Sequence, residues 1–340
     1  MKILITGSLG LVGSEAVKFF LDKDWKVITT DSNMRANFFG TEKQEHNGGD
    51  YHDTDIRDEK GINDLFALYK GFDAIIHCAA QPSHDYSKDH ALEDFDINAR
   101  GTLILLEATR KYCPDATFVH ISTDKVYGEN MMAWSGYDYI GGTKHITELP
   151  TRFQIAKNWG FDEKLGLDFA GNRSLFGCSK TAADIYAQEY ANYFGMKVGV
   201  FRPGCITGKN HKGAELHGFL AYLVKCIKEE KTYKIFGYKG KQVRDQIHAY
   251  DLVTACYEFI QNPKPNGVYN IGGGPERSVS VLEAINLIEK ETGKKAKVEY
   301  HEARRGDRIW DVHDVSKFRK DYPNWDYKYS LQDIIKDLCI

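Results

Sequence analysis

Glycines near the N-terminus are spaced for binding a diphosphate. They lie in Gly7-Ser-Leu-Gly10-Leu-Val-Gly13, directly after the short apolar run Lys2–Thr6. Glycine-rich turns join many strands to many helices, so the pattern alone is weak. A strand, a glycine turn and a helix start in this order let the backbone approach a pyrophosphate, and the helix N-terminus supplies N–H groups and a positive dipole end. The segment therefore predicts a dinucleotide site.

A carboxylate follows at the distance that such a site requires. Asp31 ends a second buried-type run, Trp25–Thr30, about 20 residues beyond the glycines. Its side chain can accept hydrogen bonds from both adenosine ribose hydroxyls and repels a 2′-phosphate, which favours NAD over NADP. Arg35 lies close in sequence and weakens that preference.

Hydroxyl, acidic and basic side chains gather after another apolar run. The run Thr117–Ile121 continues into Ser122-Thr-Asp-Lys125, and a later helical segment carries Phe176 and Lys180 four residues apart, on one helical face. In open parallel sheets, ligands bind beyond the carboxyl ends of the strands. We therefore expect these segments to meet the dinucleotide there.

The elements that must position these residues alternate along the first 203 residues. Apolar runs at 74–78, 117–121 and 198–201 are preceded by helical patterns such as 102–111 and 182–194. This alternation predicts an α/β fold, a Rossmann-type doubly wound parallel sheet.

The pattern changes beyond residue 204. Helical patterns at 219–230 and 281–292 are separated there by short strands and Gly/Pro turns. We interpret 204–340 mainly as a smaller, interleaved C-terminal substrate-binding region, with 241–262 returning to the Rossmann domain of residues 1–203. The irregular segment 129–173 is expected to be an active-site lid or an insertion.

Composition places the chain among ordinary globular proteins. Its 340 residues are 42% hydrophobic with a formal net charge of −3, so no basic excess suggests a nucleic-acid partner. No apolar stretch approaches a membrane span, and the N-terminus reads as a strand rather than a signal peptide. The cysteines are scattered without a C-x-x-C pair, which indicates the reduced thiols of a cytoplasmic protein rather than disulfides or a zinc site.

Together the motifs resemble those of the extended short-chain dehydrogenase/reductase, NAD-dependent nucleotide-sugar epimerase/dehydratase family. That family carries an N-terminal G-x-x-G-x-x-G, a Ser/Thr segment ending in V-Y-G, and Y-x-x-x-K. Segments that are further similar to its CDP-paratose (CDP-tyvelose) 2-epimerase group are Ser122–Gly128, Leu167–Phe169, Phe176–Lys180, Phe201–Arg202, Gly240–Asp245 and Tyr269–Gly273.

The resemblance implies where NAD is bound. The glycine loop would hold the diphosphate, Asp31 the adenosine ribose and Lys180 the nicotinamide ribose. The residues assigned to the cofactor in this way are Gly7, Gly10, Leu11, Val12, Gly13, Asp31, Ser32, Asn33, Arg35, Asp55, Ile56, Ala79, Ala80, Gln81, Asn98, Ser122, Lys180 and Pro203. Asn98 and Asp55 also have structural explanations, a helix cap and a turn respectively.

The family mechanism requires a tyrosine that this chain lacks. In that mechanism a tyrosinate removes the proton of a sugar hydroxyl while hydride passes to NAD, and hydride later returns to the other face of the keto intermediate. Thr123 matches the residue that hydrogen-bonds this hydroxyl. Phe176 occupies the tyrosine position and cannot act as the base, a role that typically contributes about 10²- to 10⁴-fold in rate.

Explanations of different kinds remain open for Phe176. The protein could bind NAD and a nucleotide-sugar yet turn over poorly, or another group could transfer the proton. It could also catalyse a 4,6-dehydratase reaction, because those relatives carry an acidic residue directly after the threonine, as in Thr123-Asp124-Lys125. An epimerase is favoured over a dehydratase, and a dehydratase over a non-catalytic binder. The candidate groups for proton transfer are Thr123, Asp124, Lys125, Tyr127, Glu215 and His217.

Substrate contacts are expected from the C-terminal third. The resemblance assigns the grip on the nucleotide diphosphate to Arg244 and Arg304, whose guanidinium groups suit phosphate oxygens. Gln242, Glu215 and His217 are further candidates for substrate binding. No metal is expected, since the loop that holds Glu215 lacks a convincing set of ligands. The resemblance favours a CDP-sugar and implies a homodimer, but the differing loop leaves base and sugar open.

Overall fold

The computed structural model describes residues 1–34, 36, 45–46, 48–128, 146–155, 160–167, 173–211, 218–303 and 307–340. The chain divides into two compact units. The first comprises Met1–Val126, Ser174–Arg202 and Leu252–Tyr269; the second comprises Tyr127–Arg173, Pro203–Asp251 and Asn270–Ile340. The domain boundaries expected from the sequence, with their lid at 129–173, stay a prediction.

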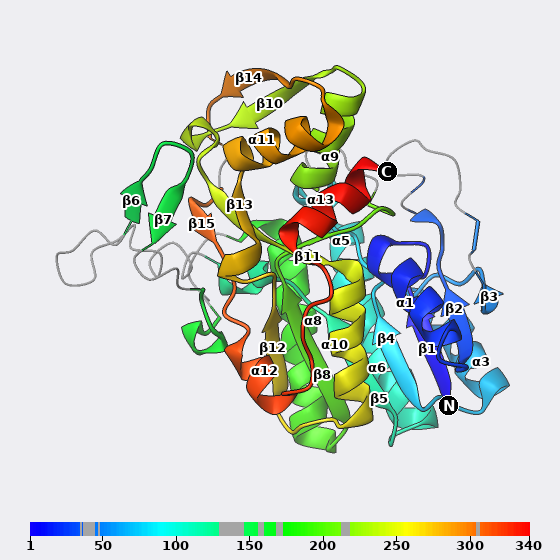
Figure 1. Cartoon of the computed structure of the whole chain (residues 1–340). Helices are drawn as coiled ribbons and strands as arrows, with labels where there is room; N and C mark the ends of the chain where they lie inside the picture. The colour runs from blue at the N-terminus through cyan, green and yellow to red at the C-terminus, as the bar shows by residue number, and fades with distance from the viewer. Residues whose placement is uncertain are drawn as a thin grey trace. The chain divides into compact units, whose positions relative to one another are not determined.

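A seven-stranded sheet forms the centre of the first unit, in the order β12-β8-β5-β4-β1-β2-β3 (Figure 1). The neighbours from β8 to β3 pair in parallel register. The strands are β1 Lys2–Thr6, β2 Lys26–Thr30, β3 Asp50–His52, β4 Ala74–His77, β5 Thr117–Ile121, β8 Lys197–Pro203 and β12 Gly267–Ile271. The predicted Rossmann-type α/β fold is confirmed.

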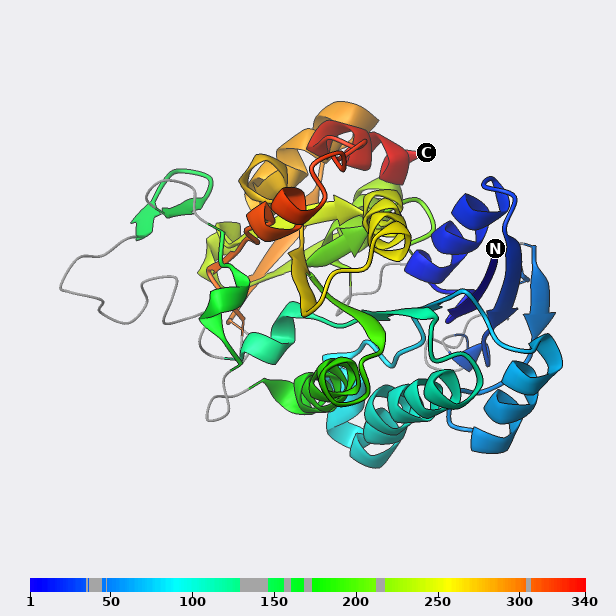
Figure 2. The ribbon, with the colours of Figure 1, turned by 90° about the horizontal axis from the view of Figure 1, so that it is seen from below.

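Helices cover both faces of this sheet, as Figure 2 shows. On one face lie α1 (Leu11–Leu21) and α10 (Ala249–Gln261), whose aromatic rings Phe19 and Tyr257 meet edge-on at 5.4 Å. On the other lie α3 (Glu59–Tyr69), α6 (Gly101–Tyr112) and α8 (Ser174–Phe194). Because both faces are covered, the strands read as nearly continuous apolar runs.

The strand order reverses within the first unit. The chain runs from β1 to β2 on one side, and then crosses to β4 on the other side of β1. In open α/β sheets, ligands bind beyond the carboxyl ends of the strands at such a reversal. After β4 come the short helices α4 (His84–Asp89) and α5 (Ala91–Phe95) and a π-helical turn, Asp96–Arg100, which leads into α6.

The second unit contains smaller sheets and its own apolar core. Strand β11 (Val243–His248) pairs with β9 (Cys205–Thr207), β13 (Ser278–Ser280) and β15 (Trp310–Asp311). Strands β10 (Thr232–Phe236) and β14 (Lys297–His301) pair in parallel, and β6 (Ile146–Glu148) pairs antiparallel with β7 (Phe153–Ile155).

Helices complete this unit. They are α9 (Phe219–Lys228), α11 (Val281–Thr292), α12 (Ser316–Asp321) and α13 (Leu331–Cys339). Leu223, Ile288 and Ile334 are fully buried in a core shared by α9, α11 and α13. Among the described helices, none combines the length and the apolar composition that a membrane crossing needs.

Candidate active site

The glycine loop has no room for a side chain at two of its glycines. It follows β1, and Gly7 has a left-handed φ of +67°. A Cβ on Gly7 would lie 2.5 Å from the backbone nitrogen of Ala79, and one on Gly13 would lie 2.0 Å from the carbonyl oxygen of Gly7. Gly10 caps α1 without any side-chain hydrogen bond. The bare backbone and helix N-terminus of this loop fit a diphosphate.

Asp31 ends β2 beside the same loop. Its Oδ2 accepts the Leu9 N–H at 3.0 Å, and its Oδ1 accepts the Asn33 N–H at 2.7 Å. Burial raises the pKa of Asp31, with a smaller contribution from the charges of Asp53 and Asp55. The backbone bonds set the direction of this carboxylate, and the neighbouring acids disfavour a 2′-phosphate.

Asp55 is held by an arginine of the following turn. Its carboxylate accepts from Arg57 Nη2 at 2.7 Å and from the Arg57 backbone N–H at 2.8 Å. Burial would raise the pKa of Asp55, but the bonds and charge of Arg57 outweigh it and lower the pKa overall. Ile56 is buried. These contacts close a turn, and an adenine-flanking role for Asp55 and Ile56 stays a prediction.

Asn98 connects the end of β4 to α8. It lies in the π-helical turn, where its Oδ1 accepts the Gln81 N–H at 2.9 Å and its Nδ2 donates to the Gln81 carbonyl at 3.0 Å. The same Nδ2 lies 3.0 Å from Ser179 Oγ. Asn98 therefore does not cap a helix; it braces the Ala79–Gln81 turn against α8.

Lys180 is buried within the first unit. Its Nζ donates to the carbonyl oxygen of Ile121 at 2.7 Å. Burial lowers the pKa of Lys180 to about 8, although the charge of Asp184 acts in the opposite direction. Because Ile121 is the last residue of β5, this bond ties α8 to the turn that carries Thr123.

A buried ion pair supports that turn. Arg202 on β8 contacts Asp184 with Nη2 at 2.8 Å and Nε at 2.9 Å, and both side chains are almost fully buried. The second oxygen of Asp184 also accepts the Ser122 hydroxyl at 2.5 Å. Ser122 thus faces the interior of the unit, and Thr123 follows it at the end of β5.

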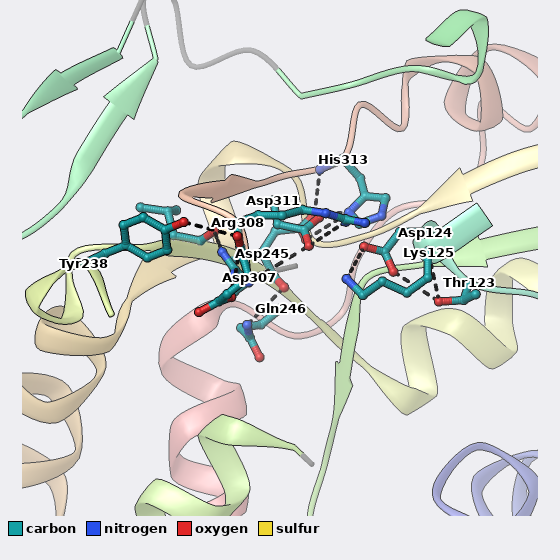
Figure 3. A network of polar contacts seen from close by, with 12 residues as sticks. Thr123, Asp124, Lys125, Tyr238, Asp245, Gln246, Asp307, Arg308, Asp311 and His313 are labelled. Atoms are coloured by element: carbon teal, nitrogen blue, oxygen red, sulfur yellow. Dashed lines mark hydrogen bonds and ion pairs between the residues drawn. The ribbon is translucent and has the colours of Figure 1, made fainter. Parts of the chain in front are cut away.

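Thr123, Asp124 and Lys125 form a local polar group, seen on the right of Figure 3. The Thr123 hydroxyl donates to Asp124 Oδ1 at 3.1 Å, and Lys125 Nζ contacts Asp124 Oδ2 at 2.8 Å. The Lys125 N–H donates to Thr123 Oγ1 at 3.3 Å. Both oxygens of Asp124 are therefore engaged, one by a hydroxyl and one by an ammonium group.

Phe176 lies on α8 one turn before Lys180, as the spacing predicts. Its side chain is only 7% exposed. Its ring meets the imidazole of His84 edge-on, with centroids 4.9 Å apart, and its N–H donates to Ser87 Oγ at 3.1 Å. His84 and Ser87 were not among the candidate residues. The signal that could have found them is their place in α4, just after the carboxyl end of β4.

The expected substrate residues belong to the second unit. Arg244 on β11 contacts Asp307 with Nη2 at 2.6 Å and donates to the Val243 carbonyl. Gln242 donates to the Phe236 carbonyl at 3.0 Å. Figure 3 also shows Arg308, which contacts Asp311 at 3.1 Å. The expected residues that lie outside the described ones are Arg35, Arg304, Glu215 and His217.

A buried aspartate–histidine pair is a further feature that sequence reasoning missed. Asp245 on β11 lies 3.0 Å from His313 Nδ1 and accepts the N–H groups of His313 and Gly274. A Cβ on Gly272 would lie 2.3 Å from an oxygen of Asp245. The pair braces the turns after β12 and β15. Asp245 follows Arg244 directly in the sequence. Its partner His313 is 68 residues away, so local sequence patterns do not reveal the pair.

Comparison with known proteins identifies the family. Residues 3–272 match the NAD dependent epimerase/dehydratase family. The chain belongs to this family. The expectation of an NAD-dependent epimerase or dehydratase enzyme is therefore confirmed, and the glycine cradle and Asp31 fit the cofactor that the family uses.

Individual relatives cover nearly the whole chain. CDP-paratose 2-epimerase of Salmonella typhi is 31% identical over 99% of this chain and 98% of its own length. A dTDP-glucose 4,6-dehydratase of Escherichia coli is 27% identical over 97% and 86%. The structure of UDP-glucose 4-epimerase from Thermotoga maritima, solved with UDP-glucose, superposes with a TM-score of 0.77 at 25% identity, over 99% and 97% of the two chains.

Proposed function

We propose that this protein epimerises a nucleotide-sugar through a transient keto intermediate. The similarity to CDP-paratose 2-epimerase over 99% of the chain carries the proposal. The named substrates of the other relatives are also sugars joined to a nucleoside diphosphate. A CDP-sugar is the first candidate, because the relative with the higher identity acts on one.

The first unit holds the groups that the reaction needs. Bound NAD supplies a hydride acceptor that can return the hydride to either face of the same carbon. Thr123 Oγ1 hydrogen-bonds the hydroxyl of that carbon, and Lys180 holds the nicotinamide ribose. The Asp184–Arg202 pair fixes the turn before Thr123 through Ser122. Leu11, Val12, Ala80 and Pro203 are proposed cofactor contacts, as are Ser32 and Asn33.

The second unit is proposed to bind the nucleotide diphosphate. Arg244 would exchange its contact with Asp307 for phosphate oxygens, since a guanidinium group suits both partners. Gln242 lies two residues away on the approach to β11. Arg304, Glu215 and His217 remain proposed contacts from segments outside the described residues.

A 4,6-dehydratase reaction is the second candidate. The observation that favours it is the Thr123–Asp124 hydrogen bond, with Lys125 balancing the carboxylate charge. In such a site the threonine hydroxyl can hold the sugar in place, and the acid beside it can give a proton to the leaving hydroxyl. Such a pair would suit an elimination of water, for which an acid must act next to the oxidised carbon.

NMR spectroscopy in deuterated water separates the candidates. The protein would be incubated with NAD and, in turn, CDP-, UDP- and dTDP-sugars. An epimerase produces a new anomeric spin system without accumulating NADH, whereas a dehydratase incorporates deuterium at C5 and forms a 4-keto-6-deoxy sugar. Retained NAD binding without conversion of any sugar would overturn both reactions and leave a binding protein.

We also propose a cytoplasmic homodimer that pairs through α8. Ile185, Tyr186 and Tyr193 are 41%, 47% and 77% exposed, and their spacing places them along one side of the helix. The cysteines are all free thiols, which suits a reducing compartment. Sedimentation equilibrium tests the dimer: Tyr186→Glu with Tyr193→Glu should give monomers, and Leu68→Glu on α3 is the exposed control.

A further inference from the structure

An imidazole lies against the ring that replaces the expected phenol. His84 begins α4, and its ring centroid is 4.9 Å from that of Phe176 at an interplanar angle of 67°. The side chain is exposed, while Phe176 is buried. We propose that His84 accepts and returns the proton of the reacting sugar hydroxyl. This assignment rests on the proposed function and names the group that makes it possible without a tyrosine.

The histidine is anchored to the same helix end as Phe176. His84 Nδ1 lies 2.7 Å from Ser174 Oγ, which also accepts the Gly177 N–H at 3.2 Å. Ser87 Oγ donates to the His84 carbonyl at 2.7 Å and accepts the Phe176 N–H at 3.1 Å. These bonds hold the imidazole at a set position next to residue 176, within one unit of the fold.

The contact with Ser174 allows Nε2 to be the basic nitrogen. Ser174 Oγ can accept a second hydrogen bond, so Nδ1–H of His84 can donate to it. In that tautomer Nε2 carries the lone pair and is the basic nitrogen. Histidine is also the side chain whose ordinary pKa of about 6.5 is closest to neutral, which favours reversible proton transfer.

Three other groups in the described residues have polar contacts of their own. The Tyr86 hydroxyl donates to Glu93 at 2.5 Å, and burial together with that carboxylate raises the pKa of Tyr86 to about 12. The Tyr127 hydroxyl donates to Asn270 at 2.7 Å. Asp124 is paired with Lys125. A phenol whose pKa is raised in this way, as for Tyr86, keeps its proton at neutral pH.

NAD, the cofactor of the family, accepts and returns the hydride in this step. As the sugar carbon gives hydride to NAD, the O–H bond breaks, the proton moves to Nε2 of His84, and the C–O bond becomes a carbonyl. On return of the hydride to the other face, the imidazolium gives the proton back and the hydroxyl forms again. The sugar carbon is oxidised and then reduced, and no proton or electron is left over.

A double-mutant cycle with Phe176→Tyr tests this role. His84→Ala should lower kcat by about 100-fold or more with little change in KM. In the Phe176→Tyr background the phenol supplies the base, so adding His84→Ala should cost less than about threefold. His90→Ala, an exposed histidine that stacks on Tyr86 at 4.1 Å, is the matched control and should leave kcat unchanged.

The outcomes separate this inference from the proposed function. Conversion of a nucleotide-sugar by the natural sequence with an unchanged kcat in His84→Ala would overturn the role of His84 and keep the function. Equal losses from His84→Ala in both backgrounds would indicate a positioning role and also overturn it. No conversion of any nucleotide-sugar by either protein would overturn the function, and the inference with it.

An independent readout needs no turnover. Nitrogen-15 NMR of the histidine side chains, assigned with His84→Ala, reports which ring nitrogen carries the proton. The Nδ1–H tautomer is expected for His84 in the NAD-bound protein. The Nε2–H tautomer would overturn the assignment, because Nε2 would then have no lone pair to accept the proton.

Discussion

The glycine loop and the start of α8, both in the first unit, present different kinds of groups. The loop between β1 and α1 presents backbone, and a side chain at Gly13 would meet the carbonyl of Gly7. The start of α8 presents side chains, and the chemistry proposed for it depends on single atoms such as the oxygen that Phe176 lacks. A backbone site survives many changes around its glycines, whereas a side-chain site can be rebuilt by one residue from a neighbouring element.

Gly13→Ala should have the largest effect, because its added Cβ would lie 2.0 Å from a backbone oxygen that cannot move alone. We expect a loss of about 4 kcal/mol or more in unfolding free energy, or at least 100-fold weaker NAD binding. Urea denaturation and calorimetric titration measure these quantities. Gly195→Ala is the control, since it strains φ but its Cβ meets nothing. Unchanged NAD affinity in Gly13→Ala would contradict a backbone-built site.

Arg202→Met should destabilise the protein, because this arginine holds Asp184, which in turn holds the Ser122–Thr123 turn. It leaves the buried carboxylate of Asp184 without its cation, which costs about 3–5 kcal/mol in unfolding free energy. Removing both charges together with Asp184→Leu should cost less than the single change. Chemical denaturation of the three variants measures the cycle. If Arg202→Met alone were neutral, the pair would not support the Ser122–Thr123 turn.

Lys180→Met should lower activity and raise the free energy of unfolding. The Lys180 pKa is about 8 in the folded protein against 10.5 ordinarily, so between these values the unfolded chain binds more protons and stability rises with pH. Below pH 8 the buried ammonium group is charged in the folded protein, which lowers the free energy of unfolding by about 3 kcal/mol. The variant should be more stable at pH 7 by about 1–2 kcal/mol, after the lost bond to Ile121, and should lose the rise above pH 8.

Urea unfolding at pH 7 and pH 9.5 measures this difference. Lys60→Met, at an exposed lysine of α3, is the control and should keep the pH dependence of the natural protein. An unchanged pH dependence in Lys180→Met would show that the ammonium group is well solvated in the folded protein, contrary to its burial.

Asp31→Asn should have the smallest effect on NAD binding. It changes the side chain beside the glycine loop that is proposed to bind the adenosine ribose. Losing the charged acceptor should weaken NAD binding by about 10-fold, while NADP binding improves. Titrations of both cofactors test this, with Asp115→Asn, at an exposed aspartate in the turn before β5, as the control. Because burial raises the pKa of Asp31, NAD affinity of the natural protein should fall as the pH drops through that raised value. A larger loss than for Gly13→Ala would reverse the comparison.

Local patterns allowed much of the fold to be predicted. The run Thr117–Ile121 and the helical pattern Val281–Thr292 agree with β5 and α11 at both ends. The pattern at 219–230 predicts α9, which ends at Lys228. Apolar periodicity and glycine spacing are local properties, so they can be read without knowing what packs against them. The same holds for the family motifs, which belong to single loops or turns.

The pairings that distinguish this site are not local. His84 and Ser174 are 90 residues apart, and Asp245 and His313 are 68 apart. From the sequence alone one could deduce the Rossmann-type fold, the NAD cradle and the absence of the tyrosine. Which side chain stands beside Phe176, and which acid holds the Ser122 turn, followed only from the packing of α4, α8 and β8. Distant segments meet there because burial of their apolar neighbours brings them together, and no spacing along the chain records that contact.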